Sequence, residues 1–167
     1  IHFDAKSHLF PFDNIALDLT TLTFRPMQKD DYVSQTTGYS WVEPEQYTID
    51  KVNNILATIF PDKTERDNVL ELLATCLESK SLEKMLVFFG TGANGKTTLL
   101  NLLYAALGYH AVQISSSYLI NPKLIKETSV FRYYKSCKML ALSNQFGNKK
   151  PYEPKMREIL GLTSDSP

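Results

Sequence analysis

The sequence has few cysteines, no excess of either charge and no long apolar run. Its two cysteines, Cys76 and Cys137, lie far apart and have no CxxC or His-rich neighbours. This spacing argues against a disulfide framework and a structural zinc site, and it favours a reducing compartment. The longest apolar cluster, Met85 to Phe89, is much shorter than the ~20 residues needed to cross a bilayer. We therefore expect no membrane role.

The charges cancel, since 18 Lys and Arg residues stand against 18 Asp and Glu residues. No overall positive charge attracts nucleic acid, so any nucleic-acid binding must come from local patches or from assembly. The 43% apolar and 22% charged residues indicate a globular domain and exclude wholesale disorder. Because the chain starts at Ile1 without a charged-then-apolar leader, we expect a piece of a longer protein that is not secreted.

Two hydrophobic patterns divide the first half of the chain. In residues 1–43, apolar and polar residues alternate over short runs, so we expect a β-rich lead-in with a hairpin or two. Residues 44–82 have helical spacing that Pro61 interrupts, which predicts two consecutive amphipathic helices, over 47–60 and from Asp62 to Leu77. The alternating runs of the lead-in are 15–19 and 21–26.

The third segment, 83–167, alternates strand-like and helix-like runs, which is typical of a βαβ sheet. The continuous apolar run Met85 to Phe89 predicts a buried parallel strand. The stretch after Lys96 is rich in helix formers and apolar nearly all round, so we expect a buried helix that Gly108 ends. Further strands are expected near 111–114 and at 138–142.

A match to G-x-x-x-x-G-K-[ST], the Walker A loop, lies between the first of these strands and the helix. Glycines allow backbone N–H groups to wrap phosphate oxygens closely, and the helix that follows adds its positive end. We expect Lys96 to be the catalytic residue at the β- and γ-phosphates, and Thr97 to join the shell of Mg²⁺. Thr98 is expected near the α-phosphate of ATP. The predicted nucleotide-binding residues are Gly90, Thr91, Gly92, Ala93, Asn94, Gly95, Lys96, Thr97 and Thr98.

A Walker A loop does not by itself identify the class of NTPase. A second, acidic site normally follows a neighbouring strand, where it holds Mg²⁺ and helps to activate the attacking water. The candidate strand, 138–142, is followed by Ser143, Asn144 and Gln145, which are neutral. Asn144 cannot act as a general base, because an amide has no proton-accepting carboxylate.

The segment 88–100, with Asn94 directly before the second loop glycine, resembles the Walker A loop of superfamily 3 helicases. More narrowly, it resembles the primase-helicases of large DNA viruses, phages and plasmids. Residues 9–39 are similar to the stretch that precedes the ATPase core in that family, and 136–143 falls where its Walker B strand should be. The next motif of the family would begin at 160–165.

The resemblance implies an α/β fold, a P-loop NTPase (AAA+-like) sheet with flanking helices, incomplete in this chain and preceded by the lead-in. Residues 44–82 would be a helical linker or collar, and 83–167 the N-terminal half of the ATPase domain. The complete protein would hydrolyse ATP with Mg²⁺ and unwind single-stranded or forked DNA as a homo-oligomeric, usually hexameric, ring. It would work in the cytoplasm or a viral replication compartment. The sensor residue and the arginine finger would follow Pro167.

Three hypotheses follow from these residues. The leading one is an ATP-dependent replicative primase-helicase fragment. The second, suggested by Asn144, is a catalytically degenerate nucleotide-binding module that supports assembly without hydrolysis, and the third is a P-loop phosphotransferase. No D-x-D cluster is present, so we assign no primase chemistry to these residues.

Several other residues have an ordinary structural interpretation. The basic patches 131–138 and 149–157 are typical of solvated faces, with contact to single-stranded DNA as the alternative. Trp41 is expected to pack with Tyr39 and Tyr47. The histidines have no ligand spacing and are interpreted as surface or structural residues; they are His2, His8 and His110.

Overall fold

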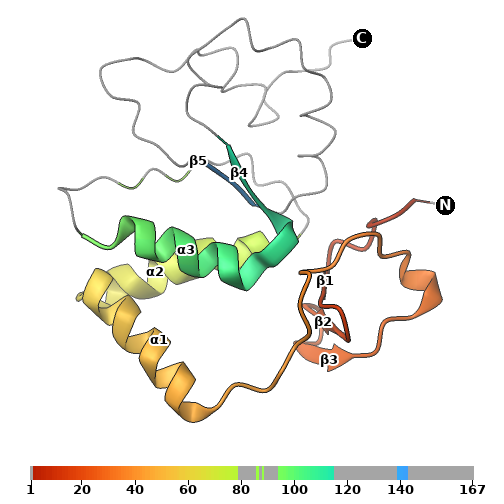
Figure 1. Cartoon of the computed structure of the whole chain (residues 1–167), viewed down its shortest axis with the longest axis horizontal. Coiled ribbons are helices and arrows are strands. Elements are labelled where there is room, and N and C mark those ends of the chain that lie inside the picture. Colours follow the sequence, from red (N-terminus) through yellow and green to blue (C-terminus); the bar gives the residue numbers. More distant parts are fainter. Residues whose placement is uncertain (1, 79–85, 87, 89–93, 115–138, 143–167) are drawn as a thin grey trace, which may run out of the picture.

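The computed structural model of the chain describes residues 2–78, 86, 88, 94–114 and 139–142. In this part a small antiparallel sheet comes first, three helices follow, and a parallel strand pair comes last (Figure 1). The structure is therefore mixed α and β, as expected. The boundaries predicted at 43 and 82 stay a prediction. No helix in these ranges is long and apolar enough to span a membrane.

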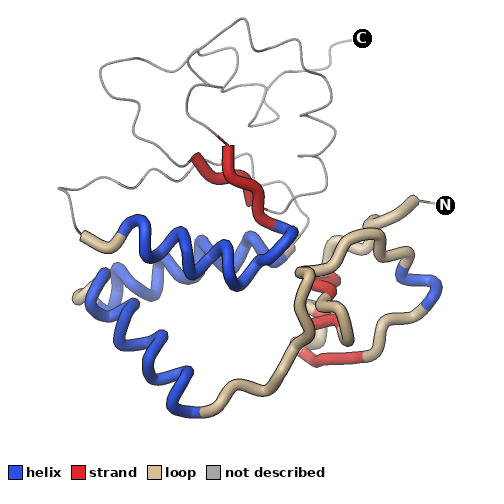
Figure 2. Tube along the Cα trace, viewed as in Figure 1, coloured by secondary structure: helices blue, strands red, loops and turns tan. Residues whose placement is uncertain are grey.

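The lead-in folds into a three-stranded antiparallel sheet, the small red strands of Figure 2. Its strands are β1 (Leu9–Pro11), β2 (Ala16–Asp18) and β3 (Thr23–Arg25). β2 and β3 lie within the two predicted runs, which confirms the β-rich lead-in. β1 was not expected as a strand. It is an edge strand, where the missing N–H of Pro11 leaves no gap in the ladder.

An aromatic cluster forms the core of the lead-in. Phe10 and Phe12 are buried, with their ring centroids 5.3 Å apart. Trp41 stacks on Phe24 at 4.4 Å and contacts Phe12 at 5.3 Å. The expected partner Tyr47 is 73% exposed instead, because it lies on the first turn of the next helix.

Asp31 is the buried charge of the lead-in, and its side chain is 1% exposed. Arg25 donates to both carboxylate oxygens, at 2.8 and 3.0 Å, and Lys6 Nζ donates to Oδ1 at 2.8 Å. The backbone N–H of Gln28 donates to Oδ2 at 2.8 Å. The hydrogen bonds from Arg25 hold the pKa of Asp31 well below the usual range of a carboxyl, against the opposing effect of burial. One carboxylate therefore joins the N-terminal loop, β3 and the turn after it.

The linker segment forms two helices, as predicted. α1 (Gln46–Ile59) ends before Pro61, and α2 (Lys63–Ala74) begins after Asp62, whose side chain accepts from the N–H of Glu65 at 2.7 Å. A short 3₁₀ turn, Thr75–Leu77, follows α2.

The helix α3 (Lys96–Leu107) packs against α1 and α2 (Figure 1). Leu99 of α3 is buried with Leu56 and Leu73, one from each of the other helices. The predicted ends of α3 are confirmed, but the expected burial on all sides is wrong. Only one side meets the other helices, and the opposite residues Asn101, Ala105 and Ala106 are exposed.

The last two strands, β4 (Ala111–Ile114) and β5 (Met139–Leu142), are parallel and in register, from Ala111 opposite Met139 to Ile114 opposite Leu142. These two strand predictions are confirmed. The strand expected at 85–89 lies mostly outside the described residues. Of its described members, neither Leu86 nor Phe88 belongs to a strand, and Leu86 is 42% exposed. Phe88 packs on the Leu99 cluster.

The lead-in holds the C-terminal end of α3. Tyr39 Oη donates to the carbonyl oxygen of Ala106 at 2.5 Å. The N–H of Tyr109 donates to the carbonyl oxygen of Thr37 at 3.0 Å. Gly108 sits so close to this loop that an added Cβ would lie 1.9 Å from Thr37 O. His110 is buried beside Phe10, which confirms a structural role.

We predict that Asp31→Asn lowers the free energy of unfolding by about 2 to 4 kcal/mol, because one oxygen that accepts hydrogen bonds becomes an N–H₂ group that faces donors. Since the folded-state pKa of Asp31 is depressed, its stabilisation is complete above the unfolded pKa of about 3.9 and is lost as the pH falls below it. Denaturant unfolding between pH 7 and pH 3 measures both effects.

The matched control is Asp30→Asn, which removes the neighbouring exposed charge. It should change stability by less than about 0.5 kcal/mol. Equal effects of the two substitutions would show that the buried network does not stabilise the lead-in.

Candidate nucleotide-binding site

The predicted phosphate loop ends at the first turn of α3. Of the predicted residues, Asn94 to Thr98 are described and lie together at this turn. Gly90, Thr91, Gly92 and Ala93 lie outside the described residues. The structure therefore places the half of the motif that carries the lysine and the two threonines.

Gly95 is the residue on which this turn depends. Its backbone has φ of +85° and ψ of 0°, the left-handed region that favours glycine. Its carbonyl oxygen accepts the N–H of Leu99 at 2.9 Å and so starts α3. A Cβ at this position would lie 2.6 Å from Cγ1 of Ile59, the last residue of α1. Both the turn and the packing therefore require glycine here.

Lys96 is the first residue of α3 and is half-buried. Its Nζ donates a hydrogen bond to Oδ1 of Asn94 at 2.6 Å. Thr97 and Thr98 are exposed, so their hydroxyl groups are accessible to a ligand at the same end of the helix. The first N–H groups of a helix have no intrahelical acceptor and carry its positive end. An ammonium group, two hydroxyl groups and these N–H groups suit an anion such as a phosphate chain.

The corner between α1 and α2 supports this turn from behind. Ile59 and Phe60 pack on the cluster of Leu56, Leu73 and Leu99. Arg66 of α2 donates to the carbonyl oxygen of Phe60 at 2.7 Å and so fixes the corner. The start of α3 is held by packed side chains of two other helices.

The parallel pair β4 and β5 follows α3 in the chain. Its register puts Ile114 and Leu142, the C-terminal residues of the strands, at the same edge. Ligands of parallel α/β sheets bind beyond this edge. Asn144 and Gln145 follow β5 in sequence but lie outside the described residues, as do the patches 131–138 and 149–157. Within the described ranges no three His, Cys, Asp or Glu side chains are grouped to hold a metal ion.

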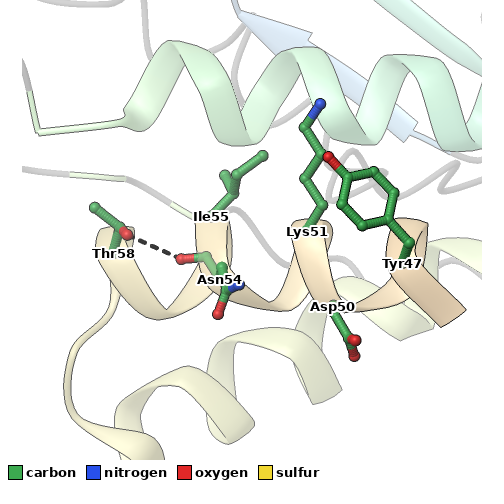
Figure 3. A pocket seen from close by; sticks show the side chains of 6 residues that line it. All are labelled: Tyr47, Asp50, Lys51, Asn54, Ile55 and Thr58. Atoms are coloured by element: carbon green, nitrogen blue, oxygen red, sulfur yellow. Dashed lines mark hydrogen bonds between the residues drawn. The ribbon is translucent and has the colours of Figure 1, made fainter.

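A separate open hollow of about 440 Å³ runs along α1 (Figure 3). In this view Tyr47, Lys51 and Ile55 point toward α3, and Asp50 points away from it. None of the described loop residues, Asn94 to Thr98, lines it, so we treat the hollow separately from the candidate site. Its described lining residues are Tyr47, Asp50, Lys51, Asn54, Ile55 and Thr58.

Sequence reasoning missed two contacts of the site. The helical spacing of 47–60 places Ile59 on an apolar face, but nothing in the pattern identifies Gly95 as its neighbour. The bond between Asn94 and Lys96 was also missed. The available signal was the position of Asn94, a side chain with a neutral acceptor, two residues before the lysine.

We predict that Gly95→Ala lowers the free energy of unfolding by about 1 to 3 kcal/mol, because the methyl group strains the left-handed backbone and overlaps Ile59. In an Ile59→Ala background the overlap disappears and only the backbone strain remains. In a double-mutant cycle, the loss of stability in the double variant should therefore be smaller than the sum of the two single losses by at least about 0.5 kcal/mol.

Ile49→Ala provides the control cycle, because Ile49 lies on the same helix and is 38% exposed. The loss of unfolding free energy caused by Ile49→Ala should add to the loss caused by Gly95→Ala. Additivity in both cycles would contradict the contact between Gly95 and Ile59.

Comparison with known proteins finds one matching family and two viral relatives. Residues 1–61 match the family described as "D5 N terminal like". The chain is 38% identical over 110 residues to a protein named as a putative helicase in Acanthamoeba polyphaga mimivirus, an alignment that covers 64% of this chain and 12% of that protein. It is 29% identical over 121 residues to another so named in Invertebrate iridescent virus 3, covering 70% of this chain and 13% of that protein.

Both alignments are longer than the family match, so the similarity extends beyond residue 61. The chain spans about an eighth of the length of these relatives. These matches bear out the resemblance to the primase-helicases of large DNA viruses: residues 1–61 match the D5 N-terminal-like family, and the chain is similar to viral proteins named as putative helicases.

Proposed function

We propose that the chain is part of a replicative primase-helicase of superfamily 3 that binds ATP and Mg²⁺ through residues 90–98. The observation that carries the proposal is the first turn of α3, where Gly95 is left-handed and Lys96 begins the helix. The N–H groups, hydroxyl groups and ammonium group at this turn are donors that suit a phosphate chain. The relatives named as viral helicases favour a helicase over other users of the same loop.

In this proposal the side chains of Lys96, Thr97 and Thr98 each have a separate role. Lys96 places its charge at the β- and γ-phosphates, and Thr98 hydrogen-bonds near the α-phosphate. Thr97 offers its hydroxyl oxygen to Mg²⁺, a ligand type that this ion prefers. When bound, Mg²⁺ would neutralise charge that develops on the phosphate oxygens. Gly95 allows the left-handed turn that precedes Lys96, in a position where a side chain would overlap Ile59.

The strand pair is consistent with a P-loop sheet of the AAA+ type. β4 and β5 are parallel, and β5 is the candidate Walker B strand. The carboxyl edge of such a sheet is where the loop and the Walker B side chains meet a nucleotide. The proposed sheet would be completed by further strands of the longer protein.

The activity of the whole protein is part of the proposal, since this chain covers only 12% and 13% of its relatives. We propose that the protein forms a homo-oligomeric ring of six subunits around single-stranded or forked DNA. Hydrolysis of ATP would drive the ring along the strand. Contacts to the DNA backbone would come from basic segments such as 131–138, with bases stacked on tyrosines.

One residue favours a second candidate function. Asn144 follows β5 where the family resemblance expects Glu or Asp. With a neutral amide there, the chain would bind a nucleotide and hold an interface between subunits without hydrolysing it. Turnover by the whole protein distinguishes the two candidates.

We predict that Lys96→Ala in the full-length protein lowers DNA-stimulated ATP hydrolysis by roughly 10² to 10³-fold, because a charge that stabilises the transition state is lost. Phosphate release with and without single-stranded DNA measures it. Lys29→Ala, at an exposed lysine of the lead-in, is the control and should retain the wild-type rate. Unchanged turnover in Lys96→Ala would overturn the proposed site. If the wild-type protein binds ATP tightly but does not hydrolyse it, the second candidate is favoured.

A further inference from the structure

The contact between Asn94 and Lys96 joins the two side chains on either side of Gly95. Asn94 Oδ1 accepts a hydrogen bond from Lys96 Nζ at 2.6 Å. Asn94 is exposed and Lys96 is half-buried. Because Gly95 is fixed by its left-handed turn and by Ile59, the geometry that brings the two side chains together belongs to a supported part of the fold.

A lysine side chain is long and flexible, and ordering it opposes binding. A hydrogen bond to its ammonium group restricts the side chain before any ligand arrives. The acceptor here is an amide oxygen, which carries no formal charge. The contact thus orients the lysine without placing a negative charge beside its ammonium group.

A carboxylate in the same place would act differently. It would form an ion pair with Lys96 that an incoming phosphate must break, and it would repel the phosphate through its own charge. Asparagine at this position therefore separates orientation of the lysine from neutralisation of its charge.

We propose that Asn94 is a positioning residue that presents the ammonium group of Lys96 to the phosphates of a nucleoside triphosphate. This inference rests on the proposed function and deepens it, because it assigns Asn94 to the lysine rather than to the nucleotide. It distinguishes the role of this side chain from the roles proposed above for Lys96, Thr97 and Thr98, which would contact the ligand directly.

The experiment measures the affinity of the full-length protein for a fluorescent ATP analogue with Mg²⁺. Asn94→Ala removes the acceptor and should weaken binding about 3- to 10-fold. Asn94→Asp keeps an acceptor but adds a charge, and should weaken binding more than about 30-fold at low salt. The excess loss in Asn94→Asp should shrink at high salt, because salt screens exposed charges.

Asn101→Asp is the matched control, since it adds the same charge at an exposed position of α3, the helix that Lys96 begins. It should bind the analogue within about 2-fold of wild type. Thermal unfolding of each variant separates loss of affinity from loss of structure.

A cycle with Lys96→Ala tests whether Asn94 acts through the lysine. In that background, Asn94→Ala should change affinity by less than about 2-fold, measured at raised analogue concentrations. An undiminished effect there would mean that Asn94 contacts the ligand itself, and would overturn the positioning role.

The two levels of the proposal fail in different ways. If the wild-type protein does not bind the analogue, the proposed function fails and this inference with it. If the wild type binds the analogue and both Asn94→Ala and Asn94→Asp bind it with wild-type affinity, the inference is overturned and the nucleotide site stands.

Discussion

The close packing of Gly95 against Ile59 is the constraint on which the candidate site depends. Ile59 is the last residue of α1, and it belongs with Phe60 to the apolar cluster formed by all three helices. With a side chain excluded at Gly95, the backbone turns in the left-handed region and α3 begins there. The position of Lys96 is thus set by burial of apolar surface in another part of the chain, and any loosening of that cluster would move the lysine.

The other end of α3 is held as firmly, by the lead-in. Tyr39 and Thr37 bind the end of the helix through hydrogen bonds, and Gly108 permits the close approach. The loop that makes these contacts lies within the D5 N-terminal-like segment, residues 1–61. Asp31 in turn joins the N-terminal loop to β3 through Lys6 and Arg25. The segment that matches this family therefore anchors the helix that follows the proposed nucleotide loop.

Local patterns predicted the elements of this fold well, and long-range contacts poorly. Helical spacing, Pro61, Asp62 and Gly108 located all three long helices, because these signals act within a few residues. β1 was missed because its three residues are too few to show alternation. The burial of Asp31 could not be predicted, since its partner Lys6 is 25 residues away in sequence. For the site, the motif identified the residues, but the support from Ile59 depends on how helices pack.

Amide hydrogen exchange of the full-length protein, with and without ATP and Mg²⁺, tests the central claim most directly. The first N–H groups of a helix have no intrahelical acceptor, so those of Thr97 and Thr98 should exchange quickly in the free protein. Bound phosphates would accept them. The account predicts that ATP slows exchange at residues 96–98 and at the adjoining end of α1, and leaves β1 to β3 unchanged. Binding of ATP without protection of residues 96–98 would contradict it.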